Sequence, residues 1–337
     1  MASPWTPPPP IPAQPQASGR DLVASAIREA KSRGEKLPRK PRRPLRPHHP
    51  FALEAEYFAV LRTAVKELYA EIHHQVQVGY EQMTTEVQRR AGKHDALESD
   101  LGRLRRILRW SWVRKLAHLE RRAAHVAKRV ATSNLKTHQA QLKHVLGVNV
   151  IAAEPWLADE EAIWTHENAA LIKDLGEQAI NRVARLVSDA VRSGTGTKAL
   201  RQQIQGELGI AERRAALIAV DQVGKYNGRL TQRRQQAIGV EEYLWRGVLD
   251  QRERPAHVSR EGQKFRWDNP PPDGNPGIPI RCRCTAEPLL DIYADLLASE
   301  PETDRSIRPS AEYPPDAPDW ASPRQTPEQH AAAAAQL

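Results

Sequence analysis

Cysteine is nearly absent from this 337-residue chain, which contains only Cys282 and Cys284. Two cysteines separated by a single residue cannot build a disulfide framework, and a bond between them would close a very small, strained ring. The sequence therefore excludes an extracellular scaffold held by disulfides. We expect a protein that is made and kept in a reducing compartment.

Aromatic residues and long apolar runs are also scarce. Aromatic side chains make up 5% of the chain, so a core must be built mainly from leucine, isoleucine, valine and alanine. No apolar run is long enough to cross a bilayer, and the start, Met1 to Trp5, is not typical of a signal peptide. We expect a soluble protein without membrane contact, made inside the cell and long enough for two domains.

Charge, by contrast, is abundant and unbalanced, with a net value of +9 that favours a polyanionic partner. Residues 1–50 are predicted to be a proline-rich, basic, disordered arm. Its basic residues alternate with prolines: Arg39, Lys40, Arg42, Arg43 and Arg46. The arm is interpreted either as a solvated linker or as a segment that contacts double-stranded DNA non-specifically, through phosphate charge alone.

Residues 51–150 contain two apolar stripes at helical spacing and are predicted to be an N-terminal helical region. The first stripe is Leu53, Tyr57, Leu61, Ala64, Leu68 and Ile72. The second is Leu101, Leu104, Leu108, Trp112, Leu116, Leu119, Ala123, Val126 and Val130, and it ends in a segment that stops at Gly147. Arginines cover the other faces of this second helix, so we expect a cationic surface without a platform for stacking bases.

A second helical group is predicted after Asn168. Thr197 follows a glycine-rich turn and is predicted to be the N-cap of a short helix that ends at Gly209. A further helix is predicted to follow and to stop at Gly239. From Tyr243 the apolar period changes to two, which is typical of short strands. The fold class is therefore mainly α: a helical bundle followed by a small antiparallel β-containing module, between disordered N- and C-terminal ends. Residues 291–337 are predicted to be a disordered tail.

An ordered set of motifs in residues 160–290 resembles a known family. It comprises the glycine-rich turn, Arg214-Ala215-x2-Ile218-Ala219-x-Asp221-Gln222, Trp245, Asp250-x3-Arg254-x2-His257-x4-Gly262 and Pro276-Gly277-x4-Cys282-Arg283-Cys284. This set resembles the phage Mu F-like minor head proteins, the phage head morphogenesis family. Residues 1–150 and the tail lie outside the resemblance.

The resemblance implies a structural role in a tailed phage or prophage. Family members are low-copy proteins of the phage head that act at the portal vertex during assembly. The expected partners are therefore the portal protein and other head or scaffold proteins, together with packaged DNA. The expected location is the virion, and the host cytoplasm during assembly.

The two cysteines and one histidine are candidate metal ligands. His257, Cys282 and Cys284 are ligand types that zinc prefers, and Asp250 is a candidate for the fourth position of a structural site. The alternative is that the cysteines are small buried hydrophobes and that His257 and Asp250 tie loops together with Arg254. Under either reading, Arg254, Gly262 and Trp245 belong to the structural motif of the module.

No motif of an enzyme accompanies these residues, and we predict no catalytic residue. The sequence has no nucleophile elbow, no H-E-x-x-H helix and no P-loop. The alternative is a metal-dependent nuclease, or another DNA-processing enzyme, built on Asp250 and His257. We expect a structural protein, with zinc as the only cofactor to consider.

Overall fold

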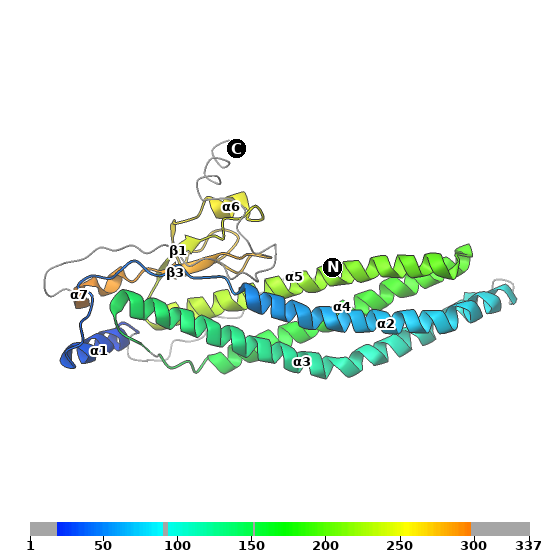
Figure 1. Cartoon of the computed structure of the whole chain (residues 1–337), viewed down its shortest axis with the longest axis horizontal. Helices are drawn as coiled ribbons and strands as arrows, with labels where there is room; N and C mark the ends of the chain where they lie inside the picture. Colours follow the sequence, from blue (N-terminus) through cyan, green and yellow to red (C-terminus); the bar gives the residue numbers. More distant parts are fainter. Residues whose placement is uncertain (1–18, 90–93, 151, 298–337) are drawn as a thin grey trace.

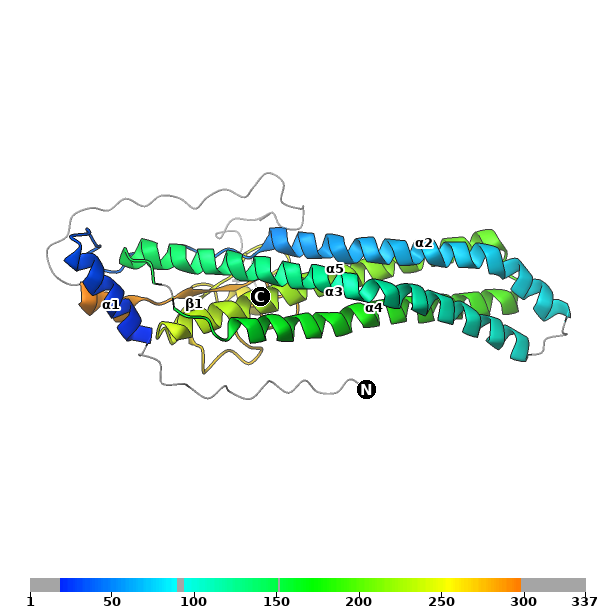
Figure 2. The same ribbon diagram turned by 90° about the horizontal axis from the view of Figure 1, so that it is seen from below.

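The computed structural model describes residues 19–89, 94–150 and 152–297. Four long helices form an antiparallel bundle (Figure 1): α2 (Phe51–Arg89), α3 (His94–Leu146), α4 (Leu157–Ser193) and α5 (Thr197–Ala237). At 1.5 Å per residue, the 53 residues of α3 span about 80 Å. Figure 2 shows α3 between α2 and α4, and α5 completes the bundle against the same two helices. The prediction of a mainly α protein with a small β module is confirmed.

The apolar stripes predicted from the sequence form the core of this bundle. Every residue of the first stripe is buried, and the second is buried except for Leu116, which is partly exposed. Gly176 of α4 allows a close approach, because a Cβ there would lie 2.2 Å from the indole nitrogen of Trp112. Residues 53–131 of α2 and α3 therefore share one core with α4 and α5. Among the described residues, no helix combines the length and the apolar character that crossing a bilayer requires.

Helix ends agree with the sequence at two glycines and differ at two other positions. Gly147 and Gly239 have φ values of 79° and 80°, in the left-handed region that favours glycine. Gly209, however, does not end a helix. α5 continues through it because Ala211 and Ala215 carry the buried stripe onward, at a helix-propensity cost of about 1 kcal/mol. Thr197 is the first residue inside α5 and makes no side-chain cap, so its predicted N-cap role is wrong.

The β-containing module follows α5 and packs against it. Its three strands are β1 (Glu242–Arg246), β2 (Lys264–Arg266) and β3 (Thr285–Pro288), all antiparallel in the order β2-β1-β3. A short helix, α6 (Pro255–Val258), lies between β1 and β2.

Two glycines on α5 make the contact with this module close. A Cβ on Gly228 would lie 2.5 Å from the carbonyl oxygen of Pro276, and one on Gly224 would lie 3.0 Å from that of Cys282. On the module side, Gly277 has φ 90°, and a Cβ there would lie 2.7 Å from the carbonyl oxygen of Gly224. The loop that carries the cysteines is therefore seated directly on the backbone of α5.

A separate small core covers the end of the bundle beside the module. It joins α1 (Gly19–Ser32), the 3₁₀ turn η1 (Asp291–Tyr293) and α7 (Ala294–Leu297) to the ends of α3 and α5. Tyr293 is fully buried, and its hydroxyl donates a hydrogen bond to the carbonyl oxygen of Ile238. Residues 291–297 are thus folded, contrary to the predicted tail. The remainder of that tail, from residue 298, lies outside the described residues.

The basic arm is also attached to the body over its described part. The amide of Arg42 donates to the carbonyl oxygen of Val145 (3.2 Å), and Gln141 donates to that of Leu45 (2.9 Å). The hydroxyl of Thr285 reaches the carbonyl oxygen of Pro47 at 3.3 Å. The segment before α2 therefore runs as a fixed strap across α3 and the module, which corrects the prediction of disorder there. Residues 1–18 lie outside the described residues.

Candidate functional site

The centre of the module is positioned by β1. Trp245 is fully buried. Its amide donates a hydrogen bond to the carbonyl oxygen of Gln263, and its carbonyl oxygen accepts one from the amide of Gly262. Gly262 has φ 73°, which explains why glycine stands there. Beside it, the guanidinium of Arg246 makes two hydrogen bonds, of 2.7 and 3.0 Å, to the buried carboxylate of Glu287 on β3. This fork joins the two strands and holds the sheet in register.

The three predicted soft ligands meet in this structure. His257 lies on α6, and Cys282 and Cys284 lie on the loop before β3. All three are buried, with exposed fractions of 2–4%, and their ligand atoms lie within 4.8 Å of one another. Nδ1 of His257 is 3.7 Å from Sγ of Cys282 and 3.4 Å from Sγ of Cys284. The three candidate ligands named from the sequence thus lie together in one cluster.

The ring of His257 is oriented by a residue that sequence reasoning missed. Nε2 is 3.0 Å from the carboxylate of Asp273, which lies in the loop between β2 and β3, and Arg260 holds that carboxylate from the other side at 2.6 Å. Trp245 packs against the imidazole edge to face. The hydrogen bond to Cys282 and the bond to Asp273 together raise the pKa of His257. Nδ1 is thereby directed at the two sulfur atoms.

Asp250 does not take the fourth place in the cluster. Its carboxylate forms a fork with the guanidinium of Arg283 (2.6 Å to Oδ1) and accepts the amide of Arg252 (3.0 Å). Burial opposes ionisation of Asp250, but the bonds to Arg283 outweigh it and lower the pKa. The structure therefore assigns Asp250 to a buried ion pair beside the cysteines.

Glu253 lies where Asp250 was expected. Its Oε1 is 3.0 Å from Sγ of Cys284, and its other oxygen accepts the amide of Leu249. Burial raises the pKa of this carboxyl. The sequence signal was weak, because Glu253 reaches the cluster only through the turn after β1, where Leu249 adopts φ 60°.

The thiols of the cluster differ in acidity. The hydrogen bond from Cys284 lowers the pKa of Cys282 well below its ordinary value, and His257 and the amide of Gly277 lower it further. Burial raises the pKa of Cys284, and the neighbouring charge of Cys282 adds to it. The pKa values of the two thiols are thus moved in opposite directions, although both sulfur atoms lie beside the imidazole of His257.

Arg254 acts as a strut. It donates to the carbonyl oxygen of Ile280 (2.5 Å) and so fixes the cysteine loop to the start of α6. Ile280 itself is 60% exposed. The module therefore presents an exposed apolar side chain on the loop that carries the cysteines.

The basic residues of the arm divide into two groups. The guanidinium of Arg46 donates a hydrogen bond to the carbonyl oxygen of Gly247 in the module (2.8 Å) and forms an ion pair with the carboxylate of Glu261 (3.0 Å). Lys40, Arg42 and Arg43 have exposed side chains, and Arg39 is partly exposed. Within the described residues, these four make no side-chain ion pair. The arm therefore offers four free cations instead of the five predicted.

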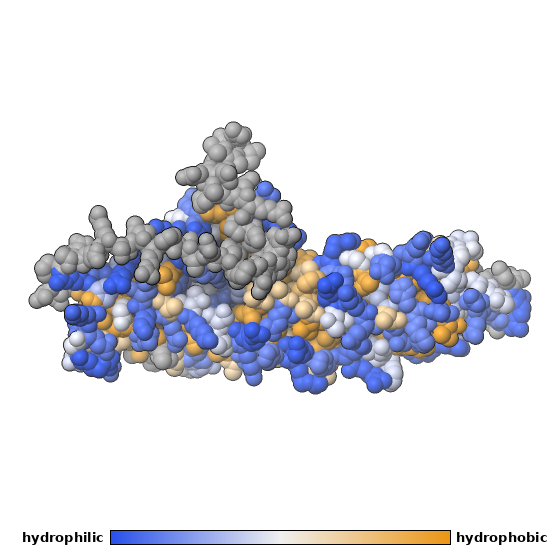
Figure 3. Space-filling view, viewed as in Figure 1, coloured by the Kyte–Doolittle hydropathy of each residue, from blue (hydrophilic) through white to orange (hydrophobic). Residues whose placement is uncertain are grey.

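The outer face of α3 adds a second cationic surface. Arg103, Arg106, Arg121 and Arg122 are exposed there and make no ion pair within the described part of the chain. Trp110, 63% exposed, lies among them, and the guanidinium of Arg114 stacks 4.5 Å from the centre of its ring. This surface therefore carries one exposed aromatic side chain among its arginines. Figure 3 shows how hydrophilic residues cover much of the visible face of the bundle.

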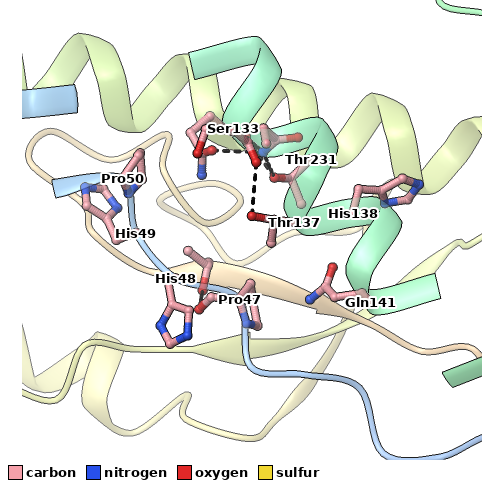
Figure 4. Close-up of a pocket in the computed structure, with 12 residues that line it drawn as sticks. Pro47, His48, His49, Pro50, Ser133, Thr137, His138, Gln141 and Thr231 are labelled. Carbon is pink, nitrogen blue, oxygen red and sulfur yellow. Dashed lines mark hydrogen bonds between the residues drawn. The ribbon is translucent and has the colours of Figure 1, made fainter. Parts of the chain in front are cut away.

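A polar cavity of about 110 Å³ lies between the arm, α3, α5 and the start of β3 (Figure 4). Its lining includes His48, His49, Thr137, His138 and Asn227. Burial, helped by the charge of Arg234, lowers the pKa of His138 to about 4. The cavity is small, and its lining comes from the arm, α3, α5 and Thr285, so it marks the place where the arm meets the bundle.

The fold and the cluster together define a helical protein with a small, closed Cys/His module seated on its last long helix. Residues 181–287, which comprise the last third of α4, α5 and nearly the whole module, match the family described as Phage Mu protein F like protein. The predicted phage Mu F-like character is thus confirmed over this region.

One curated relative and the solved structures complete the comparison. An uncharacterized protein of Haemophilus influenzae is 34% identical over 164 residues, an alignment that covers 48% of this chain and 37% of that protein. The chain thus corresponds to well under half the length of this relative. No solved structure matches the chain.

Proposed function

We propose that this protein is a structural minor component of a tailed-phage or prophage head, acting in head assembly at the portal vertex. The observation that carries the proposal is the family match over residues 181–287. It coincides with a physical unit, namely the module, the helix on which it is seated and the last third of α4. The protein would meet its partners in the host cytoplasm and remain in the virion.

The geometry supports a structural role over the nuclease alternative. A hydrolytic metal site needs an open coordination position and room for a phosphate. His257 and both cysteines are buried, and the carboxylate of Asp250 is engaged by Arg283. The alternative thereby loses the carboxylate on which it was built.

DNA contact forms a second part of the proposal. The four free cations of the arm and the arginines of α3 suit a phosphate backbone, since they bear charge without a network that reads bases. A protein inside a filled head lies against packaged DNA. The surface charge and the family match support this from separate observations.

The portal contact is tested by purifying the full chain together with the portal protein of the same phage. We expect the two to co-elute in gel filtration. Ile280→Asp should weaken the complex at least 10-fold, because a charge on an apolar anchor at an interface costs more than about 1.4 kcal/mol.

Val78→Asp provides the matched control. Val78 is 58% exposed, close to the 60% of Ile280, but lies on α2 away from the module. Its variant should bind the portal as the unaltered chain does. Separate elution of the unaltered chain and the portal would rule out the assembly role at the portal vertex.

A further inference from the structure

We propose that the module holds one zinc ion through Cys282, Cys284, His257 and Glu253. Four ligands of these types complete a structural zinc site. In a tetrahedral site with Zn–S near 2.3 Å and Zn–N or Zn–O near 2.1 Å, a sulfur lies about 3.6 Å from a nitrogen or oxygen ligand and about 3.8 Å from the other sulfur. The distances of Nδ1 from the two sulfurs, 3.7 and 3.4 Å, already match this geometry.

Glu253 fits the fourth position. Its Oε1 lies 3.0 Å from Sγ of Cys284, so an opening of about 0.6 Å would bring it to ligand spacing. The amide of Leu249 holds the second oxygen, so one oxygen is left to face the cluster. Asp250, the alternative carboxylate, is committed to Arg283.

The groups around the ligands are arranged as they are around bound metals. A metal-bound histidine commonly donates its other ring N–H to a carboxylate, and Asp273 occupies that place on Nε2 of His257. The amide of Gly277 points at Sγ of Cys282 from 3.4 Å, which is a donor suited to a thiolate. The contact at Nε2 leaves Nδ1 of His257 to face the ion. The amide of Gly277 orients Sγ of Cys282, which can accept this hydrogen bond and bind a metal at the same time.

The size of the module supplies the physical reason for an ion. Strands of three to five residues bury little apolar surface, and modules this small are often held by a metal. All four ligands come from loops and one short helix, so the ion would join the turn after β1 to the cysteine loop. Because the cluster is buried, the ion would be structural.

The test uses the full chain, treated with chelator and then titrated with Co²⁺ as a spectroscopic probe and with Zn²⁺ in competition. We expect one ion per chain, visible d–d bands of tetrahedral intensity and a thiolate-to-cobalt charge-transfer band in the near ultraviolet. Zn²⁺ should displace the cobalt. Cys282→Ser and Cys284→Ser should abolish the charge-transfer band or halve it.

Two matched carboxylate variants decide the fourth ligand. Glu253→Gln should weaken metal binding by roughly 100-fold, whereas Asp250→Asn should keep the tetrahedral spectrum. Far-ultraviolet circular dichroism shows whether the helical bundle is intact in each variant, so that loss of binding is not confused with loss of fold. A chain that binds neither ion, or one that loses the metal with Asp250→Asn and keeps it with Glu253→Gln, would overturn the proposal. The result is independent of the role in the head.

Discussion

Replacing Gly228 with alanine should detach the module from α5 and destabilise the folded module by about 3 kcal/mol, at the upper end for overpacked sites. The reason is steric, because the new Cβ would lie 2.5 Å from the carbonyl oxygen of Pro276 and 3.4 Å from the Cα of Gly277. Both are backbone atoms that cannot rotate away. The measurement is urea unfolding followed by near-ultraviolet circular dichroism, to which Trp245 and Trp267 contribute, together with limited proteolysis of the module.

Gly206→Ala is the matched control on the same helix. A Cβ at Gly206 meets no atom within 4 Å, so alanine there should stabilise the helix by up to about 1 kcal/mol. Two alanines on one helix should thus have opposite effects. Equal stabilisation by both variants would mean that the module does not sit on α5 as described.

Removing the four free cations of the arm should reduce binding to double-stranded DNA by roughly 10²–10³-fold at 0.1 M salt. The variant carries Arg39→Gln, Lys40→Gln, Arg42→Gln and Arg43→Gln, all outside helices and without ion pairs among the described residues. Each phosphate contact contributes about 0.9 to the slope of log K against log salt, so the magnitude of the slope should fall by up to about 3.6. Fluorescence anisotropy with a short random-sequence duplex measures both quantities.

The control for this experiment removes the same charge elsewhere. Arg62, Arg182, Arg192 and Arg214 each pair with a carboxylate of a neighbouring helix. Their simultaneous change to glutamine lowers the net charge by the same four units but leaves the arm intact. Binding that falls equally in both variants would show a response to net charge alone, and salt-independent binding would contradict the phosphate-contact model.

The bundle could be predicted from the sequence because its signals are local. Stripes such as Leu53 to Ile72 repeat within one helix, and Gly147 and Gly239 mark ends through their own backbone conformation. Gly209 misled for the same reason, since one glycine inside a helix costs only about 1 kcal/mol, too little to stop a helix whose buried stripe continues at Ala211 and Ala215.

The candidate site was predictable only in part. His257, Cys282 and Cys284 stand out by residue type, and the structure brings them together. The choice between Asp250 and Glu253 depends on how the turn at Leu249 folds and on where Arg283 points. The Arg283 contact joins residues that are far apart in the sequence. Asp250 and Glu253 are only three residues apart on one turn, so the sequence alone does not tell which carboxylate faces the cluster.

The ends of the chain were misread because their partners are distant in sequence. Val23 and Ile27 of α1 pack with Val145, Leu290 and Leu297, so each segment alone has too little apolar surface to indicate a folded element. The prolines of the arm correctly indicated an extended chain. They gave no sign of the contacts, at Val145 and Thr285, that fix it in place.

The presence of the chain in gradient-purified phage particles tests the central claim most directly. Heads from an induced lysate are separated by density, and the chain and the portal protein are quantified in each fraction by immunoblot. A structural head component should sediment with the particles at a constant low ratio to the portal. If the chain stays with unassembled protein at the top of the gradient while the portal sediments, a role in the head is contradicted.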